Sequence, residues 1–199
     1  MPGNAPILQL LITLMHIEPP IWRRVLVPTN MNLARLHDVI QAAMGWQEYH
    51  LHEFQIGDRR YGVPDPAFED PDFKVYHDAN LKLDAVLGRG IERFIYTYDF
   101  GDNWQHDIVI EQQLPSDASK TYPTFMAGER RCPPEDVGGV PGFYEFLDAI
   151  SDPAHEDHEH MLEWAGGRYD PDELDIYRIN LGMENMARRR RSGPRKRRS

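Results

Sequence analysis

The clearest alternation of apolar and polar positions lies in two segments joined by a short turn, residues 93–98 and 104–112. The first reads RFIYTY, and β-branched and aromatic residues of this kind suit a pleated strand. Asp, Gly and Asn fill the turn and favour a tight reversal. The pattern predicts a β-hairpin. A two-residue period in its second strand places on one face Trp104, His106, Ile108 and Ile110.

Further elements follow from the same two periodicities. Residues 7–17 form a nearly continuous apolar run, which is typical of a buried strand. The proline pair that follows reverses the chain direction, and residues 21–27 are expected to form a half-exposed strand. Apolar residues then recur every 3.6 positions between an Asn suited to an N-cap and a Gly suited to a C-cap. The additional predicted strands are residues 7–17, 21–27, 50–56 and 59–61. The predicted helices are residues 32–45, 81–87, 143–150, 160–164 and 172–185.

Strands joined mainly as hairpins and interspersed with helices indicate the α+β class, with a twisted antiparallel sheet, packed helices and a C-terminal helical segment. Residues 127–142, AGERRCPPEDVGGVPG, contain too many Pro and Gly residues for a regular element and are expected to form a long structured loop. Residues 62–80 predict a second loop. With 199 residues and 41% apolar content, we expect one domain, residues 1–185.

Charge is unevenly distributed along the chain. The last twelve positions hold eight of the 22 basic residues and no acid, whereas the rest carries 14 basic and 32 acidic residues, a net charge of −18. Such a body repels phosphate backbones, so only the tail suits nucleic acid. We expect residues 186–199 to form a disordered tail that either contacts nucleic acid weakly or stays solvated or docked. Its basic residues are Arg188, Arg189, Arg190, Arg191, Arg195, Lys196, Arg197 and Arg198.

The lack of a recognisable targeting signal and the single cysteine favour a cytoplasmic protein. No apolar run is long enough to span a membrane, and the N-terminus lacks the pattern of a secretory signal, so no membrane partner is expected. The single cysteine, Cys132, cannot form an internal disulfide, which fits a reducing compartment.

The segment YDFGDNWQHD, residues 98–107, carries the densest chemistry of the chain. We expect this turn and the later loop CPPEDVGG to form a ligand groove of a non-catalytic binding or accessory module whose partner is another protein. The turn acids have a purely structural alternative, because Asp99 and Asp102 can fix a turn by accepting backbone hydrogen bonds. The residues assigned to the groove are Tyr98, Asp99, Asp102, Trp104, Cys132, Glu135, Asp136, Gly138 and Gly139.

A metal site is the competing hypothesis. His50 and His52 share one face of a predicted strand, and if that strand lies beside the central hairpin its imidazoles meet further ligands. Imidazole and carboxylate groups suit Zn, Mn or Fe, and such a divalent transition metal would activate water for hydrolysis of a phosphoester or amide. A histidine on an apolar face is more often a core residue with one satisfied ring nitrogen. The predicted ligands are His50, His52, Asp99, Asp102 and His106.

Two other features have chemical and structural interpretations. Cys132 near His106 could be a nucleophile, but a cysteine between prolines and acids is more typical of a small buried apolar group with a raised pKa. The tract AHEDHEH, residues 154–160, looks like a metal tract, yet acids favour the start of a helix and its histidines alternate faces. No catalytic residue is assigned.

Four motifs resemble one known family. The chain resembles the plasmid pRiA4b ORF-three-like family over residues 7–185. The resemblance implies an α+β domain of uncertain biochemical role, often labelled a passenger TnpR of insertion elements, and hence a link to plasmids and mobile elements. The motifs are GW with HLHEF (residues 45–46 and 50–54), YDFGDNWQH (98–106), GERRCPPEDVGG (128–139) and WAGGRYDP (164–171).

The label implies a resolvase, and the residues argue against it. A serine recombinase needs a nucleophilic serine in an N-terminal catalytic domain and a helix-turn-helix reader, but the first serine is Ser116 and the late helices lack a basic reading face. A tyrosine recombinase needs an Arg- and His-lined site for the scissile phosphate, whereas acids surround the candidate site here.

Overall fold

The computed structural model describes residues 5–64 and 74–192. The strands are β1 (Ile7–Leu14), β2 (Ile21–Pro28), β3 (His52–Ile56), β4 (Arg59–Gly62), β5 (Val75–His77), β6 (Arg93–Tyr98), β7 (Trp104–Leu114) and β8 (Thr124–Glu129). The helices are α1 (Leu33–Met44), α2 (Leu83–Leu87), α3 (Gly139–Ser151), α4 (His158–Trp164) and α5 (Ile176–Ser192), with a 3-10 turn, η2 (Asp78–Asn80).

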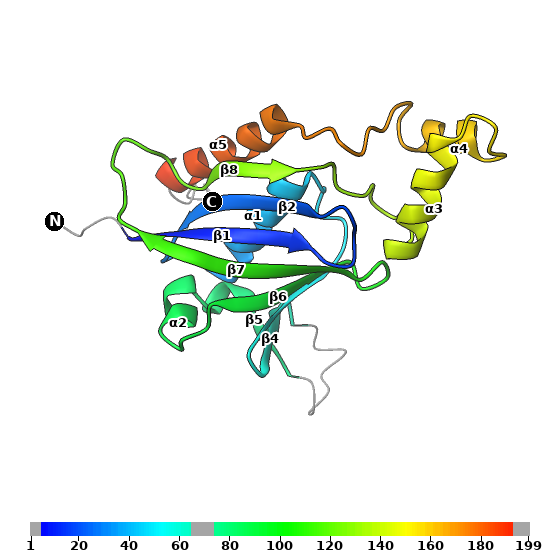
Figure 1. Ribbon diagram of the computed structural model, residues 1–199. Coiled ribbons are helices and arrows are strands. Elements are labelled where there is room, and N and C mark those ends of the chain that lie inside the picture. The colour runs from blue at the N-terminus through cyan, green and yellow to red at the C-terminus, as the bar shows by residue number, and fades with distance from the viewer. Residues whose placement is uncertain (1–4, 65–73, 193–199) are drawn as a thin grey trace, which may run out of the picture.

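All described strands belong to one eight-stranded sheet with the order β5-β4-β3-β6-β7-β1-β2-β8 (Figure 1). Every neighbouring pair is antiparallel except β4 and β5. Helix α1 covers one face of the sheet, α5 packs against α1 and β8, and α3 and α4 stand at the end of the sheet near the β6–β7 turn. The predicted α+β class is confirmed.

Local sequence features determine where helix α1 begins and ends. The side chain of Asn32 accepts a hydrogen bond from the backbone N–H of Arg35 at 3.0 Å, and Gly45 ends the helix with φ +91°. Its apolar side faces the sheet and forms much of the core. The α1 residues with no exposed surface are Leu33, Leu36, Val39, Ile40 and Ala43.

The two faces of the sheet differ in the way the β7 periodicity predicts. Trp104, His106 and Ile108 are buried against the helices, while the alternate residues are half-buried or exposed. The opposite face carries ion pairs between strands: Arg93 of β6 binds Asp107 of the adjacent β7, and Arg24 of β2 reaches across β1 to Glu111 of β7. This face therefore interacts with water through paired charges.

The prediction of a long structured loop without regular elements over residues 127–142 was wrong at both ends. Its first residues belong to β8, where Gly128 pairs with Arg23 of β2, and a Cβ at this glycine would lie 2.8 Å from the carbonyl oxygen of Trp22. Glycine thus permits a close strand pair that its propensity alone disfavours. Its last residues begin α3, whose first turn accommodates Pro141 because N–H groups there lack helical partners.

The predicted boundary of the disordered tail was also wrong. Helix α5 continues through residue 192, so residues 186–192 are helical. Arginine favours helices, and Arg188 pairs with Glu184 one turn earlier at 3.2 Å. Of the predicted tail, Arg195, Lys196, Arg197 and Arg198 lie outside the described residues, as do residues 65–73 of the predicted loop.

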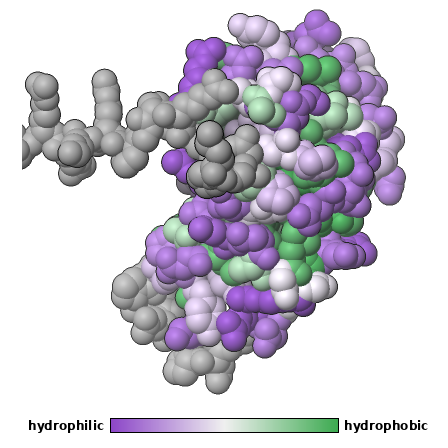
Figure 2. Space-filling model, turned by 90° about the vertical axis from the view of Figure 1, so that its left-hand side faces the viewer, coloured by the Kyte–Doolittle hydropathy of each residue, from purple (hydrophilic) through white to green (hydrophobic). Residues whose placement is uncertain are grey.

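The surface at the end of the sheet where β1 begins is mostly hydrophilic, and hydrophobic residues show between the polar ones in a discontinuous band (Figure 2). Among the described residues, no helix is both long enough and apolar enough to cross a lipid bilayer.

A buried arginine ties β2 to the segments that carry the candidate site. Arg23 is only 1% exposed, and its guanidinium donates to the carbonyl oxygens of Ala43, Glu129 and Arg130 at 2.7–2.8 Å. It also donates to the carbonyl oxygen of Trp22 at 2.8 Å. Among the described residues no carboxylate pairs with this cation, so backbone dipoles stabilise its charge.

We expect the variant Arg23→Met to lower the free energy of unfolding by about 3 to 5 kcal/mol, because it leaves several buried carbonyl oxygens without a donor. The neighbouring variant Arg24→Met removes a side chain of similar size and an ion pair that is partly exposed, and should cost at most about 1 kcal/mol. Denaturant unfolding of both variants measures the difference. Equal losses would show that the buried hydrogen bonds of Arg23 contribute little.

Candidate functional site

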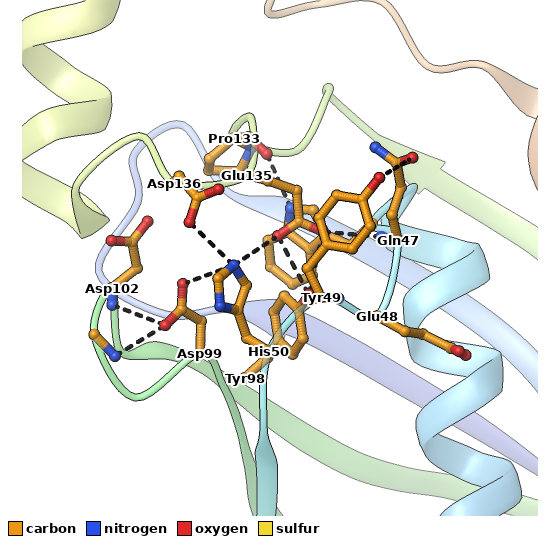
Figure 3. Close-up of polar contacts among 12 residues, drawn as sticks. Gln47, Glu48, Tyr49, His50, Tyr98, Asp99, Asp102, Pro133, Glu135 and Asp136 are labelled. Carbon is orange, nitrogen blue, oxygen red and sulfur yellow. Dashed lines mark hydrogen bonds and ion pairs between the residues drawn. The ribbon is translucent and has the colours of Figure 1, made fainter.

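The candidate site lies where three segments distant in the sequence meet at one end of the sheet (Figure 3). They are residues 45–51 between α1 and β3, the β6–β7 turn at residues 99–103, and the β8–α3 loop at residues 130–138. We refer to this region as the hairpin–loop site.

Direct hydrogen bonds hold the three segments together. The indole N–H of Trp46 donates to the carbonyl oxygen of Pro133 at 2.9 Å, and the backbone N–H of Gln47 donates to the carboxylate of Glu135 at 2.8 Å. The hydroxyl of Tyr98 also donates to the Glu135 carboxylate, at 3.2 Å. Glu135 therefore joins the loop to both of the other segments.

The turn acids fill structural roles as well. Asp99 Oδ1 accepts from the backbone N–H of Gly101 at 2.9 Å, and Asp102 Oδ2 accepts from the N–H of Gly138 at 3.2 Å. The structural interpretation of these acids therefore holds for one oxygen of each. The second oxygen of Asp99 points toward His50.

Backbone strain is concentrated around the same site. Asp99 and Asn103 in the turn both have φ +55°, and Asp136 in the loop has φ +58°. Residues other than glycine seldom occupy this left-handed region, although Asp and Asn do so most readily. Such strain persists only where surrounding contacts impose it, and it is often found at functional sites.

The imidazole of His50 faces three carboxylates. Its Nε2 atom lies 3.0 Å from Asp136 Oδ1, 3.5 Å from Asp99 Oδ2 and 4.0 Å from Glu135 Oε2. Nε2 is buried, yet none of these contacts has the geometry of a hydrogen bond. Ligand atoms of His50, Asp99 and Asp136 all lie within 4.8 Å of one another, a spacing that one metal ion could bridge.

The five predicted metal ligands do not converge. Of the five, only His50 and Asp99 come together. His50 does not share a strand face with His52, since β3 begins at His52 and His50 lies in the segment before it. His52 instead binds the buried carboxylate of Asp78 at 2.9 Å and stacks on His37 with ring centroids 3.7 Å apart. The set predicted from strand alternation was therefore wrong for His52.

His106 is a core residue and not a ligand of this cluster. It has no exposed surface, and its Nδ1 lies 3.3 Å from the carbonyl oxygen of Tyr96. Burial lowers the pKa of His106 to about 4, so the ring is neutral at pH 7. Its Nε2 has no hydrogen-bond partner among the described residues. The structural interpretation of this histidine is the one that the geometry supports.

The residues predicted to line the groove divide into two groups. The structure brings together at the hairpin–loop site Asp99, Asp102, Glu135, Asp136, Gly138 and Gly139. The side chains of Trp104 and Cys132 instead pack into the core, with 1% and 6% exposed. Tyr98 is also buried, and only its hydroxyl reaches the site.

Cys132 is unsuited to nucleophilic chemistry. Its thiol lies 3.2 Å from the sulfur of Met44 and 3.5 Å from the guanidinium of Arg23. Burial raises the pKa of Cys132 to about 11 against the opposing effect of the Arg23 charge, so the thiolate is scarce at neutral pH. The hypothesis of a catalytic cysteine is not supported.

Two features of the site were missed in the sequence. Exposed apolar side chains lie along it: Tyr49 is 65%, Leu51 60% and Phe100 55% exposed. The alternation of Tyr49 and Leu51 with the histidines could have indicated an outward face. A cavity of about 490 Å³ also lies behind the loop, between Trp46 and Tyr169, and no local pattern signals it because its walls come from separate helices.

The fold and the site together define an α+β domain with an acidic hairpin–loop site at one end of an antiparallel sheet. Residues 6–178 match the family described as plasmid pRiA4b ORF-3-like protein, and the chain belongs to this family.

Two relatives cover most of the chain. The uncharacterized protein y4hQ of Sinorhizobium fredii (strain NBRC 101917 / NGR234) is 41% identical over 184 residues, which are 92% of this chain and 93% of that protein. The crystal structure of the protein of unknown function MM3350 from Methanosarcina mazei Go1 has a TM-score of 0.78 at 35% identity, and the match covers 87% of this chain and 97% of that one. The fold is thus shared with a solved structure.

We expect Gly139→Ala to disrupt the close contact between the start of α3 and the β6–β7 turn. Gly139 has φ +68°, and a Cβ there would lie 2.6 Å from the carbonyl oxygen of Asp102. The variant should lose about 2 to 4 kcal/mol of unfolding free energy, because strain and a backbone clash add. Gly166→Ala is the control, since Gly166 has φ +89° and no atom within 4 Å of the new Cβ. It should lose only about 1 to 2 kcal/mol in the same denaturant titration. Equal losses would contradict the close contact.

Proposed function

We propose that the protein is a binding module that holds one divalent cation in the hairpin–loop site, with His50, Asp99 and Asp136 as ligands. The observation that carries this proposal is the buried Nε2 of His50, which lacks a hydrogen-bond partner and lies 3.0 and 3.5 Å from two carboxylates. A cation between these atoms would satisfy all three groups. Glu135, at 4.0 Å, would supply a fourth ligand after a small shift.

The ligand chemistry favours a transition metal. Imidazole nitrogen combined with carboxylate oxygen suits Zn, Mn or Fe, whereas Ca and Mg prefer oxygen alone. The three segments are already joined by Glu135 and Asp102, so little reorganisation would be needed to close the site around an ion.

We further propose that the site contacts another protein and does not itself catalyse a reaction. The exposed side chains of Tyr49, Leu51 and Phe100 beside the acids provide the apolar area that a protein contact needs. The family description refers to a plasmid, which supports a role linked to mobile elements by association only. Contact of the basic tail with nucleic acid stays a prediction.

Metal analysis tests the proposal directly. Full-length protein supplemented with Zn or Mn and desalted should carry about one ion per chain by plasma mass spectrometry. His50→Ala should lose that ion, or bind it at least about tenfold more weakly by calorimetry, because it removes the only nitrogen ligand. His52→Ala and His155→Ala are matched histidine controls and should retain it, since His52 is committed to Asp78 and His155 is exposed.

Two results would contradict the proposed cation site. No ion after supplementation would overturn the proposed site. An ion retained by His50→Ala but lost by His52→Ala would place it at the His52 and Asp78 pair instead.

A second candidate is a metal-dependent hydrolase of phosphoesters or amides. The observation that favours it is the accessibility of the cluster, because the side chain of Asp136 is 67% exposed and three protein ligands leave a position for water. We expect such an enzyme to hydrolyse p-nitrophenyl phosphate or a p-nitroanilide only when loaded with metal. Turnover should disappear in His50→Ala and persist in His155→Ala. A rate equal to that of the free metal would exclude these substrates.

A further inference from the structure

The two most strongly charged regions of the chain lie outside the hairpin–loop site. Residues 143–167, which include most of α3 and all of α4, hold seven acids and no Lys or Arg, and we refer to them as the acidic lobe. The acids are Glu145, Asp148, Asp152, Glu156, Asp157, Glu159 and Glu163. The basic segment, residues 188–198, holds eight Lys and Arg and no acid.

The acids of the lobe are available to a partner. All seven are exposed, and within the described part of the chain none of them forms an ion pair with a Lys or Arg. Two exposed aromatic side chains accompany them, Trp164 at 45% and Tyr144 at 37%. A guanidinium group can stack on such rings while it pairs with neighbouring carboxylates. The lobe therefore suits an arginine-rich segment.

The lobe and the C-terminal end of α5 lie at opposite ends of the sheet (Figure 1). The hydroxyl of Tyr144, in α3, accepts a hydrogen bond from the N–H of Glu18, just beyond the C-terminal end of β1. At the other end of β1, Ala187 of α5 shares a cavity with Ile7 and Pro28. Helix α5 thus carries the chain away from the lobe.

The basic segment cannot lie along the lobe of its own chain. The eight residues of β1 already separate Ala187 from the start of the lobe by about 23 Å at 3.3 Å per residue. Residues 188–192 extend α5 by roughly another 7 Å in the outward direction. The six residues from 193 to 198 span at most about 21 Å even when fully extended. A contact that uses the whole basic segment must therefore join different molecules.

We propose that the basic segment of one copy docks on the acidic lobe of a second copy. The charges are complementary, with seven acids in the lobe and seven bases in the segment besides Arg188, which pairs with Glu184. The contact is head-to-tail, so a dimer still offers the lobe of one copy and the segment of the other, and association is open-ended. It uses none of the residues assigned to the cation site, and either proposal can fail without the other.

Sedimentation velocity on the full chain tests this proposal. After nuclease treatment and removal of nucleic acid, the protein should form species larger than a monomer in 50 mM NaCl, in a concentration-dependent manner. The apparent Kd should rise at least about tenfold in 500 mM NaCl, because salt screens exposed charges. A monomer at all concentrations in 50 mM NaCl would overturn the proposal, as would an association that nuclease abolishes, which would assign the basic segment to nucleic acid.

Three variants identify the contact surfaces. The lobe variant combines Glu156→Gln, Asp157→Asn, Glu159→Gln and Glu163→Gln. The tail variant combines Arg195→Ser, Lys196→Ser, Arg197→Ser and Arg198→Ser. The control variant neutralises four exposed acids elsewhere and combines Asp58→Asn, Asp84→Asn, Glu92→Gln and Glu129→Gln. Circular dichroism melts confirm that each variant is folded before it is compared.

The lobe and tail variants should each be monomeric alone, whereas their mixture should form a one-to-one dimer, because one supplies an intact lobe and the other an intact segment. The control variant should associate like the parent, although its net charge equals that of the lobe variant. Self-association of the lobe variant at the parental strength would overturn the proposal. A mixture that stays monomeric would also overturn it.

Discussion

The hydrogen bonds of the Arg23 guanidinium are the constraint on which the candidate site depends. This one side chain donates to carbonyl oxygens at the end of α1 and at the end of β8, and both are points from which the chain enters the site. Because those oxygens are satisfied by a buried cation, neither segment can move without leaving a buried polar group unpaired. The position of Glu135 and Asp136 opposite His50 follows from an interaction that is itself far from solvent.

Elements with a local cause could be predicted from the sequence. Helix α1 has a capping side chain, a left-handed glycine and an uninterrupted 3.6-residue pattern, and all three act within the segment itself. In the β6–β7 hairpin, Asp, Gly and Asn likewise indicate the turn, and the alternation of apolar residues indicates the buried face. Strand β8 has no such cause. It exists because Gly128 allows a close approach to β2, and a glycine-rich sequence alone indicates the opposite.

The candidate site could be predicted only in part, for a related reason. Alternation identified His106 as lying on the apolar face but not how deeply that face is covered, and the ring is fully buried beside Trp46 and Tyr96. The partners of His52 were also hidden, since Asp78 and His37 belong to other elements. His50 and Asp99 do meet, but the third ligand, the carboxylate of Asp136, comes from a loop whose position depends on Arg23 and on the absence of a side chain at Gly139. Such long-range contacts leave no local pattern.

The pairing of β1 with β7 has a consequence for synthesis of the protein. Ile7 lies opposite Leu114, so during synthesis β1 leaves the ribosome long before its second neighbour, β7, has been made. Until then the β1–β2 hairpin presents an apolar strand edge with unpaired backbone groups, which is the kind of surface that recruits other chains. The rate of productive folding should therefore be limited by this long-range closure, and chaperones that shield strand edges would act on the nascent chain during that interval.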